Sequence, residues 1–158
     1  MKNSFLFKTL IDIFFFFQVI GLIALLTKIP LGFMPVKNME PLHLNGWTFL
    51  IINCIIYLIF LRGLFFMRKI AREFIIGKTL TKTIANYMKI TGNNFTSSGL
   101  ILLIIMIIDR FFNLHIDPIP KSFSITPIFL VIVGLFFIIQ SQTYLKAIKI
   151  KDENDLTV

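Results

Sequence analysis

The chain has 158 residues, of which 56% are hydrophobic and 15% are charged, and its formal net charge is +8. A soluble domain is about 45–50% apolar and about 25% charged, and its apolar residues are dispersed along the chain. Here they are collected into four long runs, which excludes a conventional soluble core. The composition predicts an all-α integral membrane protein with four transmembrane helices, forming a single membrane domain over residues 1–158.

The first apolar run covers about residues 9–27 and follows Lys2 and Lys8. It is long for the core of a cleavable signal peptide, and no small-residue cleavage site follows it. We therefore expect a retained helix that also directs insertion. Asp12 lies four residues after Lys8, on the same side of a helix. This spacing predicts an ion pair at the membrane interface; the alternative is a role in binding a proton or a ligand.

The second run covers about residues 47–67 and begins with Trp47, an aromatic residue typical of the membrane interface. The connection before it, residues 28–46, is rich in proline and is expected to be irregular. Asn53 and Tyr57 are four residues apart and share one face of the helix. This mildly polar face predicts hydrogen bonds to a neighbouring helix, with a substrate site as the alternative.

The connection at residues 68–94 is basic, but it also contains apolar residues at helical spacing. We expect the second helix to continue beyond the membrane and to stop at Gly77, which suits a left-handed helix C-terminus. Thr79 or Thr81 can then cap a short amphipathic helix that runs to about Ile90. Such a helix lies on lipid headgroups or docks a partner.

The third run covers about residues 95–112, and the small residues at positions 97–99 near its start are expected to permit close helix contact. The fourth run covers about residues 127–145 and opens with Pro127, which suits the first turn of a helix. A tail at residues 146–158 follows. The predicted order is therefore four spans with one short extra helix between the second and the third.

The distribution of Lys and Arg predicts the orientation in the membrane. The N-terminus carries two of the 16, the stretch from Arg62 to Lys89 seven, the tail three, and each remaining connection two. One side therefore holds twelve and the other four. The positive-inside rule places both termini and residues 68–94 in the cytoplasm. Because cytoplasmic loops in contact with anionic headgroups explain the net charge, no direct binding of nucleic acid is expected.

The sequence contains few residues suited to catalysis or to binding a metal or a ligand. No Asp or Glu lies in the middle of a predicted span, where a charge would indicate function. Glu40 and His43 in one outer loop and His115 and Asp117 in the other could together bind a metal, or the two histidines could simply titrate in water. Cys54, the single cysteine, is expected to be a small buried hydrophobe. We predict no catalytic, cofactor or metal residues and no enzyme activity.

The predicted partner or lipid surface combines the basic connection, the apolar face of its short helix and the acidic tail. Its residues are Arg68, Lys69, Arg72, Lys78, Lys82, Ile84, Tyr87, Met88, Lys89, Glu153 and Asp155. The acidic residues of the tail can fold back on the cations or meet a basic partner.

Two segments resemble a known family. One contains Phe74, Gly77, Thr81, Tyr87, Ile90 and Gly92, and the other is the C-terminal sequence DENDLTV. Both resemble the bacterial membrane family called domain of unknown function 2975, whose members are similar in length and are predicted to have four spans. The resemblance implies a protein of the bacterial cytoplasmic (inner) membrane. Because members are commonly encoded beside a small helix-turn-helix regulator, it also implies that the protein sequesters such a regulator or signals to it.

The expected function is therefore a non-enzymatic membrane regulator that binds a cytoplasmic helix-turn-helix transcription factor through its basic loop and tail. The alternative is a small transporter, or a resistance or immunity factor, for a lipophilic compound, with a dependence on Asp12 or Gln18. The sequence leaves the ligand, the oligomeric state and the packing order of the helices open.

Overall fold

The computed structural model of the chain describes residues 2–27, 44–77, 80–112 and 125–155. These residues form the helices α1 (Lys2–Thr27), α2 (Leu44–Ile75), α3 (Lys82–Phe112) and α4 (Thr126–Asp155), and no strand occurs among them. Each helix contains a stretch that is long and apolar enough to cross a membrane. The prediction of an all-α fold with four membrane helices is confirmed, and the chain is a multi-pass membrane protein.

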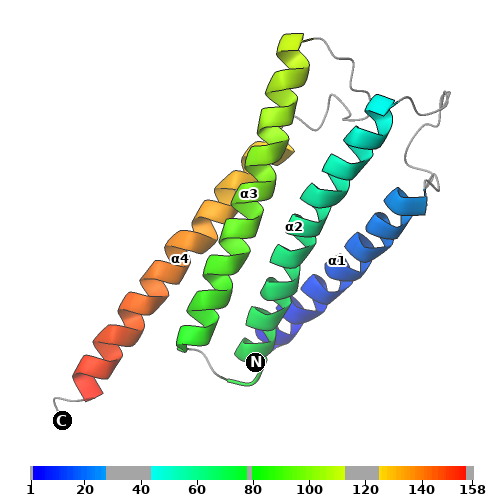
Figure 1. The fold of residues 1–158 in the computed structure, drawn as a ribbon. Coiled ribbons are helices and arrows are strands. Elements are labelled where there is room, and N and C mark those ends of the chain that lie inside the picture. The colour runs from blue at the N-terminus through cyan, green and yellow to red at the C-terminus, as the bar shows by residue number, and fades with distance from the viewer. Residues whose placement is uncertain (1, 28–43, 78–79, 113–124, 156–158) are drawn as a thin grey trace.

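The helices run alternately in opposite directions, and each packs on the next one along the chain (Figure 1). α2 and α3 occupy the centre, with α1 beside α2 and α4 beside α3. Because of this alternation, the start of α1, the end of α2, the start of α3 and the end of α4 lie at the same end of the molecule. The packing order of the helices, which the sequence left open, is thus the chain order.

The turn between α2 and α3 follows the signals in the sequence. Gly77 has a φ of +82°, a left-handed conformation that glycine adopts at a helix end without steric cost. Its N–H donates to the carbonyl oxygen of Phe74 at 3.4 Å. At the start of α3, the Thr81 hydroxyl accepts a hydrogen bond from the N–H of Ile84 at 3.3 Å. The predicted stop at Gly77 and cap at Thr81 are confirmed, whereas Thr79 lies outside the described residues.

The short amphipathic helix predicted after this turn is not a separate element. α3 continues without a break for 31 residues, so the predicted short helix forms its first turns. An established helix gains one hydrogen bond with each added residue, and no proline interrupts the sequence between Ile90 and Phe95. At about 46 Å, α3 is longer than the ~30 Å hydrocarbon core of a bilayer.

Small residues bring α3 and α4 into close contact, and they recur every seven positions, which keeps them on one side of each helix. They are Gly134 and Ser141 of α4, with Ala85, Gly92 and Gly99 of α3. Pro127 and Ile148 continue the same seven-residue repeat of buried positions on α4. A Cβ added to Gly92 would lie 2.6 Å from the carbonyl oxygen of Gly134, so the two backbones touch. The Ser141 hydroxyl also donates to the carbonyl oxygen of Ala85 at 2.7 Å.

The predicted small-residue contact at positions 97–99 holds in part. Ser98 and Gly99 are buried, and a Cβ on Gly99 would lie 2.9 Å from the carbonyl oxygen of Pro127. Ser97 is exposed, so the prediction is wrong at that position. Successive residues on a helix are about 100° apart, so three neighbours cannot all face one partner.

Larger side chains join α2 to α3. The core cluster near the turn consists of Ile70, Ile84 and Met88, packed against Phe74, Tyr87, Phe137 and Tyr144. Farther from the turn, the Phe60 and Phe95 rings stack with centroids 5.4 Å apart, and the Thr91 hydroxyl donates to the carbonyl oxygen of Gly63 at 3.4 Å. These contacts place Gly63 of α2 level with Thr91 of α3.

α1 has little buried surface. Ile11 is its one buried residue among those whose burial the structure describes, while Phe14, Phe16 and Phe17 are exposed. In a bilayer such residues are solvated by lipid tails, so their exposure carries no hydrophobic penalty. The attachment of α1 to α2 therefore depends on the specific contacts between the two helices.

Candidate functional site

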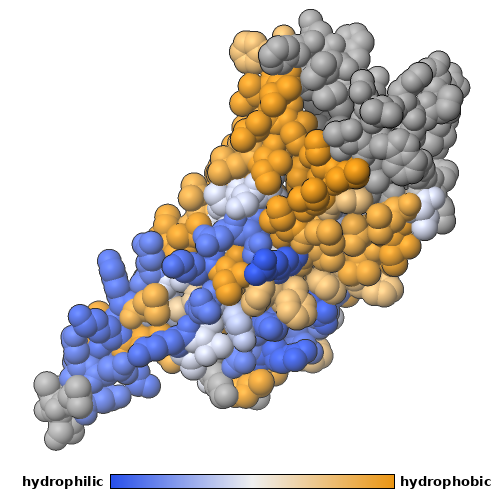
Figure 2. All heavy atoms as spheres, in the orientation of Figure 1, coloured by the Kyte–Doolittle hydropathy of each residue, from blue (hydrophilic) through white to orange (hydrophobic). Residues whose placement is uncertain are grey.

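Positive charge gathers at one end of the molecule, which we call the basic end: the start of α1, the end of α2, the start of α3 and the end of α4. The cations at this end whose side chains the structure describes are Lys8, Arg68, Lys69, Arg72, Lys82, Lys89, Lys146, Lys149 and Lys151. Figure 2 shows hydrophilic atoms over this end and hydrophobic atoms over the upper part of the described helices. The alternating helix directions thus bring together cations from three separate parts of the sequence.

Asp12 lies at the centre of an ionic cluster between α1 and α2. One of its carboxylate oxygens accepts a hydrogen bond from Nε of Arg68 at 2.6 Å, and the other lies 3.7 Å from Nζ of Lys8. The Arg68 guanidinium also lies 4.6 Å from the centre of the Phe15 ring, a cation–π contact. The predicted pair with Lys8 is confirmed, but the shorter contact is with Arg68. These two cations account for the position of the Asp12 carboxylate, and the alternative of a proton or ligand role stays a prediction.

Tyr57 joins the same two helices nearer the middle of the membrane span. Its hydroxyl donates to the backbone carbonyl oxygen of Gln18 at 2.9 Å and also contacts the side-chain oxygen of Gln18. A Cβ added to Gly21 would lie 2.6 Å from this hydroxyl, so the absence of a side chain there makes room for Tyr57. The predicted hydrogen bond to a neighbouring helix is confirmed at Tyr57.

Lys69 lies among three aromatic rings. Its ammonium nitrogen is 4.8 Å from the centre of the Phe65 ring, 5.2 Å from that of Phe66 and 5.4 Å from that of Tyr87. Phe65 and Phe66 belong to the preceding turn of α2, whereas Tyr87 belongs to α3. The ammonium is therefore directed back toward the membrane-spanning part of α2, where the rings stabilise its charge.

The predicted apolar docking face lies largely inside the molecule. Ile84 is fully buried and Met88 is 8% exposed, both in the cluster with Ile70. Tyr87 is half-buried and contacts Lys69. The prediction that Ile84, Tyr87 and Met88 form a surface free for a partner is wrong, because α2 and α4 of the same chain cover this face.

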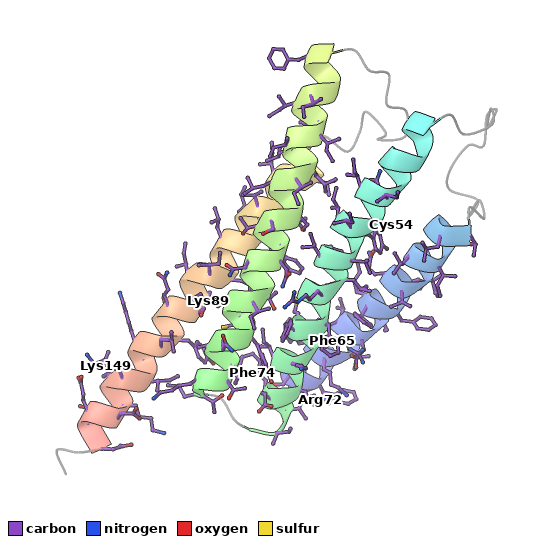
Figure 3. The ribbon with its side chains drawn as sticks, in the orientation of Figure 1. Cys54, Phe65, Arg72, Phe74, Lys89 and Lys149 are labelled. Atoms are coloured by element: carbon purple, nitrogen blue, oxygen red, sulfur yellow. The ribbon has the colours of Figure 1, made fainter. Side chains whose placement is uncertain are left out.

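The charged members of the predicted surface divide into two groups. Arg72, Lys82, Lys89, Glu153 and Asp155 are exposed, while Arg68 and Lys69 are engaged as described and Lys78 lies outside the described residues. Figure 3 labels Arg72, Lys89 and Lys149, which extend from three different helices. Glu153 pairs with Lys149 of its own helix at 3.7 Å. An accessible charged surface therefore remains at the basic end.

The end of α4 projects beyond the helix on which it packs. The register of Ser141 against Ala85 places Lys82, the first residue of α3, opposite Tyr144. The turns of α4 that follow Tyr144 extend about 16 Å farther, away from the other helices (Figure 1). Within this projection, residues 145–155, only Ile148 is buried. It is a charged helix with most of its circumference accessible.

No group of three or more His, Cys, Asp or Glu side chains suited to a metal ion occurs in the part of the chain that the structure describes. The residues of the metal hypothesis, Glu40, His43, His115 and Asp117, lie outside that part. The hypothesis therefore stays a prediction. Cys54 is a free, half-buried thiol.

Two residues have contacts or positions that were not predicted from the sequence. Gln18 was considered only for the transport alternative, although it is the partner of Tyr57. Arg62 was counted only as a topology marker, yet it is an exposed cation within the apolar part of α2. Its isolation among apolar residues was a visible signal, because a charge at such a position is costly unless it has a role.

Comparison of the chain with protein-family models, with curated proteins and with solved structures found no match. The resemblance to domain of unknown function 2975 therefore stays a prediction. The arrangement at the basic end is suited to binding charged groups at a membrane surface.

Proposed function

We propose that the protein is a non-enzymatic membrane regulator that binds a soluble helix-turn-helix transcription factor at its basic end. The observation that carries the proposal is the projecting end of α4, on which Asp152, Glu153 and Asp155 are exposed. Helix-turn-helix proteins hold DNA phosphates with basic residues. A projecting helix with three carboxylates competes for such a surface, so binding would withhold the regulator from DNA.

The proposal includes an orientation with both termini in the cytoplasm of a bacterial inner membrane. Its support is the gathering of cations at the basic end, since Lys and Arg are enriched in cytoplasmic segments. A fusion of green fluorescent protein to the C-terminus should fluoresce, whereas a C-terminal alkaline phosphatase fusion should be inactive. The reverse result would contradict the orientation and remove the projection from the reach of a cytoplasmic regulator.

The binding itself is tested with a small helix-turn-helix regulator, the partner that the family resemblance implies. A photo-cross-linking amino acid replaces Ala147 in the exposed projection, and the matched control replaces Phe136 on the exposed outer face of the same helix. We expect the regulator to cross-link at position 147 and not at position 136, and to co-purify with the membrane protein in detergent.

Charge-neutralising variants separate specific docking from general attraction. The triple variant Asp152→Asn, Glu153→Gln, Asp155→Asn is expected to abolish co-purification. The matched control removes three cations from the same projection by Lys146→Gln, Lys149→Gln and Lys151→Gln, and it should retain the regulator. Absence of binding even after cross-linking would refute the function, and equal loss in both variants would refute the assignment to the carboxylates.

A further inference from the structure

Arg62 is an exposed cation far from the end of its helix. It lies near the middle of the candidate span Ile51–Ile75 and about 15 Å along the axis from Arg72. Within the described residues it takes part in no ion pair. A charged side chain within an apolar span is rare, because it must reach the interface or meet a partner of opposite charge.

Arg62 lies on the face of α2 that neither neighbouring helix covers. Gly63 and Ile70 of α2 face α3, whereas Tyr57 and Arg68 contact α1. At about 100° per residue, Arg62 points toward neither helix. Lys69 follows Arg62 by seven residues, nearly two turns, and therefore lies on the same side.

The two cations on this face differ from Arg68, the residue directly before Lys69 in α2. The charge of Arg68 is balanced by Asp12 at 2.6 Å. Neither Arg62 nor Lys69 is paired with a carboxylate in the described part of the chain. Glu73, one turn beyond Lys69, forms no ion pair there either, so no described carboxylate lies within ion-pair distance of Arg62 or Lys69.

The Lys69 ammonium lies on the Arg62 side of its own backbone position. It is turned back over Phe65 and Phe66, toward the turn that carries Arg62. The two backbone positions are about 10 Å apart along the helix axis, so two long side chains can reach one group between them. The guanidinium and ammonium groups together match a phosphate, which an arginine binds with two parallel N–H donors.

We propose that Arg62 and Lys69 bind the phosphate of an anionic phospholipid on the open face of α2 and α3. The position selects the source of the phosphate. A lipid phosphate lies at the boundary of the hydrocarbon core. Lys69 lies less than two turns before the end of the apolar span at Ile75, and the long side chain of Arg62 can extend from within the span toward that boundary. The acyl chains then continue along the exposed apolar side chains of α2, such as Leu58 and Ile55. A soluble anion has no acyl chains to pack on this apolar surface, so nothing would offset the cost of bringing its charge there. The aromatic rings around Lys69 lie where headgroup and chains of the lipid meet.

A tryptophan placed at the site can report which lipid lies beside it. We use the full chain with Trp47→Phe and Phe65→Trp, reconstituted in vesicles with brominated lipids that quench tryptophan fluorescence. The matched control is Phe136→Trp on the outer face of α4. Phe65 lies two residues beyond Gly63 and Phe136 two beyond Gly134, and these glycines are level because Thr91 meets Gly63 and Gly92 meets Gly134. Both probes therefore lie at the same depth.

Brominated phosphatidylglycerol is expected to displace phosphatidylcholine at position 65 with a preference of about tenfold, since each cation near the surface contributes to anion binding. At position 136 the preference should be below about twofold. Arg62→Gln with Lys69→Gln should remove the preference at position 65. Lys149→Gln with Lys151→Gln, which removes two cations elsewhere, should leave it unchanged.

Three results would overturn the proposal. These are equal preference at positions 65 and 136, equal loss in the two double variants, and displacement of the lipid by millimolar inorganic phosphate, which would assign the site to a soluble anion. If the double variant does not fold, Arg62→Lys alone tests the proposal. This variant keeps the positive charge at position 62 but removes the two parallel N–H donors of the guanidinium. It should fold and lower the preference at position 65 severalfold.

Discussion

The two outer helices are attached to the centre of the molecule in different ways. α4 meets α3 through backbone contacts between Gly92 and Gly134, where an added Cβ would lie 2.6 Å from a carbonyl oxygen. α1 meets α2 through the side chains of Asp12 and Tyr57, which reach Arg68 and Gln18. A backbone contact cannot adjust without moving a whole helix, whereas a side-chain contact adjusts by rotation. The α3–α4 pair is therefore the fixed part of the protein, and the position of α1 is the part most open to change.

The bilayer explains why this difference matters. In water, burial of the many Phe side chains of α1 would hold it in place, but lipid tails solvate them as well as a protein interior does. Helix association in a membrane then depends on close packing and on polar contacts. α4 relies chiefly on close packing and α1 chiefly on polar contacts, so substitutions in the two pairs should have effects of different size.

The largest effect is expected from Gly134→Ala. The new Cβ would lie 2.5 Å from the backbone nitrogen of Thr96 and 2.8 Å from the carbonyl oxygen of Gly92, so α3 and α4 must separate. We expect the free energy of unfolding to fall by about 3 kcal/mol, the upper part of the usual range for overpacking. Reversible unfolding in mixed micelles, followed by loss of helical circular dichroism, measures it.

The matched control for this prediction is Leu135→Ala, which changes the neighbouring residue on the exposed outer face of α4. It should change the free energy of unfolding by less than about 0.5 kcal/mol. If Gly134→Ala were as mild as Leu135→Ala, the close backbone contact of α3 and α4 would be refuted, and with it the contrast between the two pairs.

The same two pairs show how far the sequence could predict the structure. The seven-residue repeat of Gly92 and Gly99 on α3, and of Gly134 and Ser141 on α4, is visible in the sequence, but it does not say which helix meets which. The local pair of Lys8 with Asp12 was predictable because helical spacing fixes it. The pair of Asp12 with Arg68 was not, because the two residues are 56 positions apart and only the packing of α1 on α2 brings them together.

The end of α2 and the start of α3 illustrate the same limit. Gly77 and Thr81 carry local signals for a turn and a cap, and both were predicted. The apolar face of Ile84 and Met88 was also recognised, but its partner was assigned to the outside of the molecule. A periodic apolar face shows that something covers it; it does not distinguish a neighbouring helix from a membrane surface or another protein.

An intermediate effect is expected from Asp12→Asn, which breaks the ionic contact between α1 and α2. Because the side chains of Asp12 and Arg68 are 31% and 34% exposed, the loss should be nearer to that of a surface pair than of a buried one, about 1 kcal/mol. In a double-mutant cycle, adding Arg68→Gln to Asp12→Asn should cost only the smaller loss of the contact between Arg68 and the Phe15 ring, because the ion pair is already broken. Lys8→Gln serves as the control and should cost less, since its contact with Asp12 is longer, at 3.7 Å. Additive effects of Asp12→Asn and Arg68→Gln would show that the contact contributes nothing to the attachment of α1.

The smallest effects are expected at the hydrogen bond between Tyr57 and Gln18, and they test whether the contact of α1 with α2 is adjustable. Tyr57→Phe should cost about 0.6 kcal/mol, the average for such bonds between membrane helices. Gly21→Ala should cost a similar amount, because its Cβ would lie 2.6 Å from the Tyr57 hydroxyl, which must move.

In the Tyr57→Phe background, however, the nearest remaining ring atom lies at 3.6 Å, an ordinary contact distance, so Gly21→Ala should then have almost no effect. The same micelle unfolding assay measures all three variants. If Gly21→Ala cost as much as Gly134→Ala and Tyr57→Phe did not relieve it, α1 would be held by rigid contact like α4, and the distinction between a fixed and an adjustable helix would be lost.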